Sequence, residues 1–210
     1  MRGRLISLEG GEGAGKSTLL AGLREHLARS GLDMLYTREP GGTPVGEAVR
    51  KLVLDPAHRG IAAESELLLM FAARAQLVRE VLQPALAAGR WVLCDRFTDA
   101  SYAYQGGGRS VDATRIAELE RIATEGLKPD LTLLLDLPVA EGRKRASQRG
   151  QADRIEAERD DFFERVRATY RARAMAEPER FCVIDASLPP DDVLQAALDA
   201  IARLRKRVAA

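Results

Sequence analysis

The stretch LISLEGGEGAGKSTLL, residues 5–20, joins an apolar run to a helical pattern through a glycine-rich turn. It matches the pattern GxxxxGKS, with four residues between Gly10 and Gly15. Glycines let successive backbone N–H groups turn toward a phosphate, and the start of the next helix adds the positive end of its dipole. In such loops the lysine, here Lys16, reaches the β- and γ-phosphates, and the hydroxyl of Ser17 binds Mg²⁺. The residues predicted to bind a nucleoside triphosphate are Gly10, Gly11, Glu12, Gly13, Ala14, Gly15, Lys16, Ser17 and Thr18.

Apolar runs alternate with helical patterns along the whole chain. The runs are continuous, as is typical of parallel strands that are covered on both faces. Strand–helix–strand repetition implies right-handed crossovers. Together with the glycine-rich loop, it predicts a doubly wound α/β fold of the P-loop NTPase type, with a five-stranded parallel sheet, in one domain over residues 1–210 in which segment 142–160 could form a helical lid. The expected strands span residues 5–8, 34–37, 91–94, 131–137 and 181–184.

Two segments do not fit this alternation. Three consecutive glycines at 106–108 predict a mobile loop. Segment 142–160 carries many charges of both signs and almost no large apolar side chains. It is therefore either a solvated helix–loop–helix or a lid that closes over an anionic ligand.

The composition excludes several classes of protein. A chain that is 46% hydrophobic and 30% charged can bury a core, so it is not a disordered tail. A net charge of +1 argues against a nucleic-acid-binding protein held by phosphate contacts. No apolar run approaches the length of a membrane span. Cys94 and Cys182 both lie in apolar runs, which is typical of buried, reduced thiols. We expect a cytoplasmic protein without nucleic-acid or membrane partners. The excess of arginine, 27 against 5 lysines, reflects either codon bias or phosphate binding.

Asp95 and Arg96 directly follow the expected third strand. In a doubly wound sheet the carboxyl ends of the strands face the ligand crevice. If the first and third strands are neighbours, Asp95 can hold Mg²⁺ or its waters and Arg96 can bind a second phosphate. The alternative is an aspartate that caps a helix beside a solvated arginine.

Five runs, in order along the chain, resemble bacterial thymidylate kinase. They are residues 9–17, TREPGGT at 37–43, MFAAR at 70–74, DRFTDASYAYQGGGR at 95–109 and RGQADRIE at 149–156. The resemblance implies transfer of the γ-phosphoryl group of ATP to dTMP, which gives dTDP and ADP. It also implies Mg²⁺ as the cofactor and a homodimer as the assembly.

The resemblance assigns residues to the acceptor, dTMP. Glu12 would face the sugar hydroxyl, and Arg74 would hydrogen-bond a thymine carbonyl. Phe71 is expected to stack on the base; Met70 is the alternative, and both side chains could instead belong to a core stripe. The remaining expected acceptor contacts are Arg50, Arg96, Ser101, Tyr104, which would crowd the sugar 2′ position, and Gln105. For Arg50, an exposed helical arginine is the competing interpretation.

Arginines of the expected lid complete the predicted site. In one branch of the family the phosphate loop lacks an arginine, and the lid supplies that charge. This chain has Gly11 and Glu12 in the loop, and it has Arg149 and Arg154 in segment 142–160. Both are expected to contact ATP, and the expected catalytic residues are Lys16, Arg96 and Arg149.

Two other classes of function remain open at this level. The chain could be another P-loop kinase acting on nucleoside monophosphates or deoxynucleosides. It could also be a nucleotide-dependent switch that hydrolyses slowly, although the acceptor-side motifs weigh against this.

Overall fold

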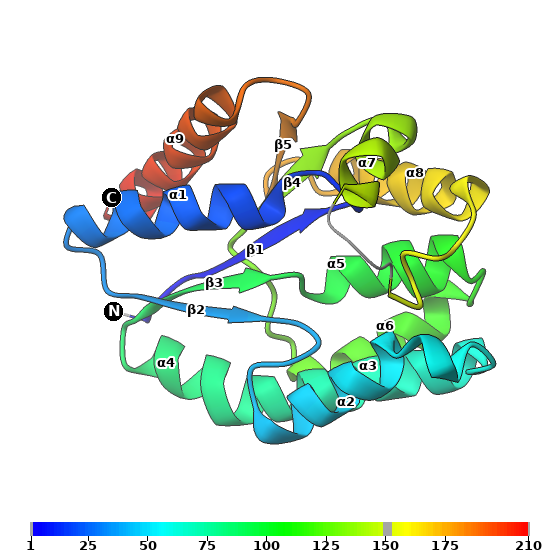
Figure 1. The fold of residues 1–210 in the computed structure, drawn as a ribbon. Coiled ribbons are helices and arrows are strands. Elements are labelled where there is room, and N and C mark those ends of the chain that lie inside the picture. Colours follow the sequence, from blue (N-terminus) through cyan, green and yellow to red (C-terminus); the bar gives the residue numbers. More distant parts are fainter. Residues whose placement is uncertain (1, 149–152, 210) are drawn as a thin grey trace.

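A parallel five-stranded sheet lies at the centre of the computed structural model, which describes residues 2–148 and 153–209 (Figure 1). The strand order is β2-β3-β1-β4-β5. The five expected strands are confirmed, four of them extended by one or two residues and one shortened by one. Their bounds are β1 (Leu5–Gly10), β2 (Met34–Arg38), β3 (Trp91–Asp95), β4 (Leu131–Asp136) and β5 (Phe181–Asp185).

Helices cover both faces of the sheet, so the predicted doubly wound α/β fold is confirmed. The helices are α1 (Lys16–Arg29), α2 (Pro44–Leu54), α3 (Ala63–Leu77), α4 (Gln83–Ala87), α5 (Thr98–Ser101), α6 (Ala113–Thr124), α7 (Val139–Ser147), α8 (Asp160–Ala176) and α9 (Pro190–Ala209). A short 3₁₀ helix, η1 (Pro56–His58), follows α2. Two π-helical segments, η2 (Val78–Leu82) and η3 (Tyr102–Gly108), continue α3 and α5.

The central strand β1 divides its side chains between two cores. Ile6 and Leu8 pack with α1 and α9, which lie next to each other on one face of the sheet (Figure 1). Leu5 packs on the other side with Leu82 and Leu86. Successive side chains of a strand point to opposite faces, so a continuous apolar run serves both layers. The fully buried Ser7 and Glu9 lie on the same side as Leu5, and they provide polar anchors within the core.

Helix α7 approaches the glycine-rich loop without side chains between the two backbones. A Cβ atom on Gly13 would lie 2.0 Å from the carbonyl oxygen of Gly142, and one on Gly142 would lie 2.4 Å from that of Glu12. Gly13 also has a φ of +72°, which favours glycine. The first part of segment 142–160 is therefore packed against the loop. Its last residue, Asp160, begins α8, and residues 149–152 lie outside the described ranges.

The prediction of a mobile loop at 106–108 is wrong. These glycines end η3, and they are the surface on which α8 packs. A Cβ atom on Gly107 would lie 2.2 Å from Thr169 Oγ1 and 2.8 Å from the carbonyl oxygen of Arg165. Consecutive glycines here permit a close helix–helix approach, which local sequence patterns cannot distinguish from a flexible turn.

Gly107→Ala tests this close packing. We expect it to lower the free energy of unfolding by about 1–3 kcal/mol, because the added methyl group meets backbone of α8 that cannot move independently. Urea unfolding would measure the change. The matched control is Gly60→Ala, where no atom lies within 4 Å of the added Cβ; it should change stability by less than about 0.5 kcal/mol. Equal stability of the two variants would contradict the packing role.

Candidate active site

A cavity of about 300 Å³ opens at the carboxyl ends of β1 and β3. Parallel pairing places Leu8 opposite Asp95, so the loops that follow the two strands leave the sheet side by side. The glycine-rich loop forms one end of the cavity, and α3, α5 and η3 form the other. The structure brings these predicted residues together in its lining: Glu12, Gly13, Ala14, Gly15, Lys16, Ser17, Arg50, Arg74, Asp95, Arg96, Ser101, Tyr104 and Gln105.

Lys16 lies over the glycine-rich loop that precedes it. Its ammonium group donates hydrogen bonds to the carbonyl oxygens of Gly10 and Gly11, at 2.9 and 3.0 Å. Burial, together with the nearby charge of Arg96, lowers the pKa of Lys16 to about 8. A polyanion bound in the loop would favour the charged ammonium. Gly10 and Gly11 shape the loop, and neither they nor the exposed Thr18 appear in the lining of the cavity.

Arg96 lies between the glycine-rich loop and the end of the cavity that α3, α5 and η3 form. Its NH2 atom donates to Glu12 Oε1 at 2.8 Å and to the Tyr104 hydroxyl at 2.9 Å. Its guanidinium also lies over the Tyr104 ring, 4.6 Å from the centroid. The backbone of Arg96 has a φ of +70°, a left-handed conformation that is costly for a residue with a side chain. Such strain at a cavity is typical of residues whose direction matters for function.

Asp95 and Ser17 fit a magnesium site. Both line the cavity, and Asp95 Oδ1 is buried without a hydrogen-bond partner in the structure. A carboxylate oxygen is a ligand that Mg²⁺ prefers, and the ion is commonly held by one or two protein oxygens together with substrate phosphates and waters. Among the described residues no group of three or more metal-binding side chains occurs. A Mg²⁺ site that is completed by phosphates and waters does not require such a group.

Arg74 is held at this same end of the cavity by a buried ion pair. Its Nε atom donates to Glu39 Oε2 at 2.7 Å, and NH1 and NH2 donate to Ser101 Oγ and the Phe97 carbonyl oxygen. Each terminal nitrogen carries a second N–H, so this planar fork can also donate to a carbonyl group in the cavity. Arg50 lies nearby, where it donates to the Pro40 carbonyl oxygen at 3.1 Å.

The structure places Met70, rather than Phe71, in the cavity. Phe71 is only 3% exposed and packs with Leu67, Val111 and Ile116 in a separate core cluster. Its ring also faces the guanidinium of Arg74, 4.5 Å from the centroid. Met70 lines the cavity beside the carboxyl end of α2. The side chain expected to cover the base is thus in the core, beneath the arginine that it supports.

Two predicted residues meet on Glu66, which is 1% exposed in α3. Gln105 donates to Glu66 Oε1 at 2.8 Å, and Arg154 pairs with Glu66 Oε2. Arg154 is 5% exposed and also donates to the Val53 carbonyl oxygen, so it lies outside the cavity lining. The geometry therefore does not bring Arg154 to the phosphate loop. Arg149 lies outside the described residues.

Three acidic residues of the lining were not assigned from the sequence. Glu39 is 5% exposed, and its Oε1 atom is buried without a hydrogen-bond partner in the structure. Glu39 belongs to the motif TREPGGT. The sequence signal that could have identified it is an acidic residue directly after a strand. Asp153 and Glu156 come from the segment after residue 152. Only the folded path of that segment shows that they reach the cavity.

Comparison with known proteins identifies the family of the chain. The family model described as thymidylate kinase matches residues 8–197. The thymidylate kinase of Chromohalobacter salexigens is 58% identical over 186 residues, which are 88% of each chain. That of Pseudomonas savastanoi pv. phaseolicola is 54% identical, over 96% of this chain and 95% of the relative. The crystal structure of thymidylate kinase from Ehrlichia chaffeensis superposes with a TM-score of 0.77 at 29% identity, over 96% of this chain and 99% of that one. The chain therefore belongs to the thymidylate kinase family.

Proposed function

We propose that this chain transfers the γ-phosphoryl group of ATP to dTMP, the reaction of its family. The observation that carries the proposal is the single cavity that joins the phosphate loop to Arg74, Met70 and Ser101. One end suits a triphosphate donor, and the other suits a planar base with carbonyl groups. A nucleotide switch would need only the first end.

The chemistry requires positioning rather than a general base. A nucleoside monophosphate presents an ionised oxygen at neutral pH, since the second pKa of a phosphate is about 6. That oxygen attacks the γ-phosphorus of ATP in line; the bond from the γ-phosphorus to the bridging oxygen breaks, and ADP leaves with the electron pair. The enzyme has to hold two mutually repelling phosphates close together.

Positive groups of the cavity offset this repulsion. Lys16 binds the donor phosphates, and Arg96 binds the acceptor phosphate. Ser17 and Asp95 would hold Mg²⁺, which neutralises charge on the donor phosphates when bound. In this proposal, segment 142–160 is a lid and Arg149 adds a further cation to the transferring group.

The acceptor end recognises thymine through shape and hydrogen bonds. Arg74 donates to a base carbonyl, and Met70 takes over the role expected of Phe71 by covering the base. Tyr104 is 5% exposed and its hydroxyl donates to Glu12 at 2.8 Å, so the ring is fixed where a ribose 2′-hydroxyl would need room. Glu12 is thereby held on the acceptor side of the loop.

A panel of acceptors tests the proposed function. With ATP and Mg²⁺, we expect ADP formation to be fastest with dTMP, compared with dUMP, UMP, dCMP and thymidine, in a coupled assay. Lys16→Ala should abolish transfer while circular dichroism shows an intact fold, because the ammonium group is lost from the phosphate loop. A preference for thymidine over dTMP, or turnover that is indifferent to all monophosphates, would contradict the proposal.

Met70 and Phe71 are separated by a pair of substitutions. Met70→Ala should raise KM for dTMP about tenfold, because apolar contact with the base is lost, and should leave thermal stability nearly unchanged. Phe71→Leu should instead lower stability by roughly 1–2 kcal/mol with a smaller effect on KM, since that ring is in the core. The opposite pattern would restore Phe71 as the base contact.

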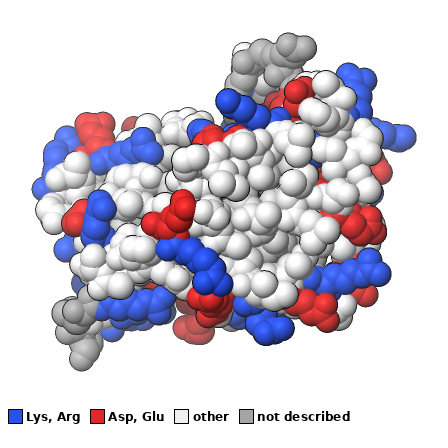
Figure 2. All heavy atoms as spheres, turned by 90° about the horizontal axis from the view of Figure 1, so that it is seen from below, with Lys and Arg blue, Asp and Glu red and all other residues white. Residues whose placement is uncertain are grey.

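We further propose that two copies of the chain associate through α2, α3 and α6. The face below the sheet has a broad area without charged side chains (Figure 2). Exposed apolar side chains on these helices are Val45, Leu52, Leu68 and Ile122. Apolar surface of this kind, on adjacent helices, suits a self-complementary dimer interface.

Leu68→Glu tests this assembly. Leu68 is 56% exposed on α3, and a buried glutamate at a dimer interface would be unpaired. We expect sedimentation equilibrium to show a dimer for the unmodified chain and a shift toward monomer for the variant. The same substitution at Leu188, 47% exposed between β5 and α9, is the control and should leave the dimer intact. A monomeric unmodified chain would refute the proposal.

We propose the cytoplasm as the location, because both cysteines are free thiols and the substrates are small phosphorylated metabolites. In the part of the chain that the structure describes, none of the helices is long and apolar enough to cross a membrane.

A further inference from the structure

Arg96 has one side-chain partner that does not belong to the cavity. Its NH1 atom donates to the Gly10 carbonyl oxygen at 3.1 Å and to the hydroxyl of Tyr170 at 3.2 Å. Glu12 and Tyr104, the partners of NH2, line the cavity, whereas Tyr170 does not. Tyr170 therefore approaches the guanidinium from α8, outside the lining of this cavity.

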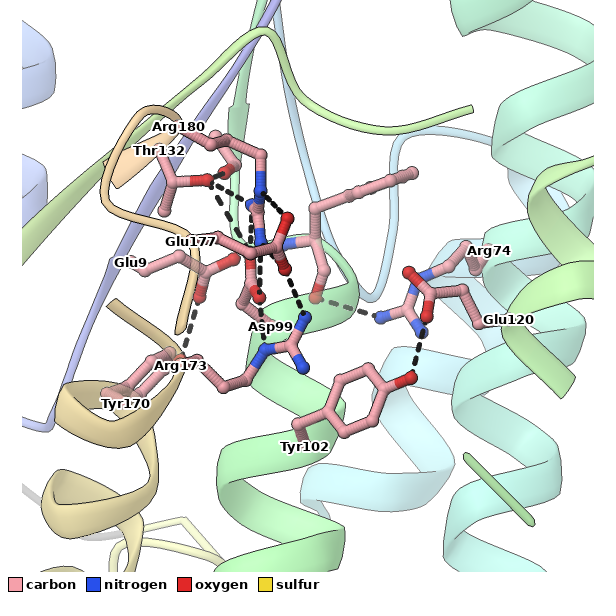
Figure 3. A network of polar contacts seen from close by, with 12 residues as sticks. Glu9, Arg74, Asp99, Tyr102, Glu120, Thr132, Tyr170, Arg173, Glu177 and Arg180 are labelled. Atoms are coloured by element: carbon pink, nitrogen blue, oxygen red, sulfur yellow. Dashed lines mark hydrogen bonds and ion pairs between the residues drawn. The ribbon is translucent and has the colours of Figure 1, made fainter. Parts of the chain in front are cut away.

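The direction of the Tyr170 hydroxyl is fixed by Glu9. Tyr170 lies in α8 and is 2% exposed, and its hydroxyl donates to Glu9 Oε2 at 2.7 Å. Figure 3 shows the ring of Tyr170 reaching from α8 toward Glu9. A hydroxyl has one proton, so with that proton on Glu9 its oxygen can only accept from Arg96. The tyrosine thus presents a lone pair to the guanidinium.

Glu9 also holds the backbone beside Arg96. It is fully buried in β1, and its second oxygen, Oε1, accepts the N–H of Phe97 at 2.7 Å. Phe97 follows Arg96, whose φ of +70° is unfavourable for a side-chain-bearing residue. One carboxylate therefore supports both the strained backbone of Arg96 and, through Tyr170, its guanidinium.

The surroundings of Glu9 keep it available for this role. Asp99, another buried carboxylate, is hydrogen-bonded to Arg173 and Arg180, as Figure 3 shows. Burial, followed by the charge of Asp99, raises the pKa of Glu9, while the charge of Arg96 and then the hydrogen bonds from Tyr170 and Phe97 favour the ionised form. Arg173 and Arg180 thus pair with Asp99 and not with Glu9. The hydrogen bonds of Glu9 come from Tyr170 and Phe97.

We infer that Glu9 and Tyr170 are positioning residues, which fix the direction of Arg96 toward the phosphate of the acceptor. The inference rests on the proposed function, in which Arg96 binds that phosphate. Neither residue is in the lining of the cavity. Their effect is therefore confined to ligands that carry the phosphate, and it requires Arg96 to be present.

Tyr170→Phe tests the inference by removing one hydroxyl. We would measure the dissociation constants of dTMP and of thymidine, which lacks the phosphate, by calorimetry. The preference for dTMP over thymidine should fall about tenfold, as expected when a hydrogen bond to a charged group is lost. Tyr102→Phe is the matched control, since its hydroxyl donates to Glu120 at 2.7 Å, away from Arg96. It should leave the preference unchanged.

A double-mutant cycle identifies the route of the effect. In an Arg96→Ala background, Tyr170→Phe should have no further effect on the preference for dTMP, because the group that it positions is gone. An equal loss of dTMP and thymidine binding would indicate a merely structural role and overturn the inference. So would an effect of Tyr170→Phe that persists in full without Arg96.

A second variant covers the case in which Tyr170→Phe does not fold. Glu9→Gln keeps an acceptor for the Phe97 N–H but offers an amide N–H₂ to the Tyr170 hydroxyl, which reverses that hydrogen bond. The preference for dTMP over thymidine should again fall, and an unchanged preference in this folded variant overturns the inference. Phosphorylation of dTMP by the unmodified chain is measured in parallel. Its absence would refute the proposed function, whereas its presence with an unchanged preference would refute only the role of Glu9 and Tyr170.

Discussion

The parallel pairing of β1 with β3 is the constraint on which the site depends. It sets Leu8 opposite Asp95, and the ladder continues one step further, where the N–H of Arg96 donates to the Leu8 carbonyl oxygen at 2.9 Å. The phosphate loop and the Asp95–Arg96 pair therefore leave the sheet at the same level. A slip of one residue would turn every side chain of the strand to the opposite face and separate the two. This register brings the phosphate loop and the Asp95–Arg96 pair together, and the neighbouring helices add the other residues of the site.

Arginine in this chain has a use that composition alone does not indicate. Arg74 pairs with Glu39, Arg154 with Glu66, and both Arg173 and Arg180 with Asp99. Each of these carboxylates is at most 5% exposed. A buried charge is costly unless it is paired and hydrogen-bonded, and the planar fork of arginine satisfies several acceptors at once. Part of the excess over lysine is thus structural: it supports the helices that carry the acceptor-side residues.

The fold was predictable because its signals are local. Each strand is a continuous apolar run, and the phosphate loop combines glycine, lysine and serine at fixed spacing. The individual contacts of the site were less predictable. Met70 and Phe71 are adjacent in a helix with few polar residues, so the sequence does not show which of them faces the cavity. The glycines at 106–108 read as a flexible turn because the helix that packs on them, α8, is more than fifty residues away in the chain.

Arg154 shows the same limit. The family resemblance implies that Arg154 contacts ATP from a lid, yet its guanidinium forms a buried ion pair with Glu66, a distant residue of α3. By itself the sequence determined which strand each motif follows along the chain. The phosphate loop follows the first strand, an acid and an arginine follow the third, and an acceptor motif comes after them. Only the tertiary structure decided which side chains line the cavity and which support it from behind. Strand periodicity and loop motifs depend on neighbours in the chain, whereas the roles of Met70, Arg154 and Tyr170 depend on contacts between elements that meet only after folding.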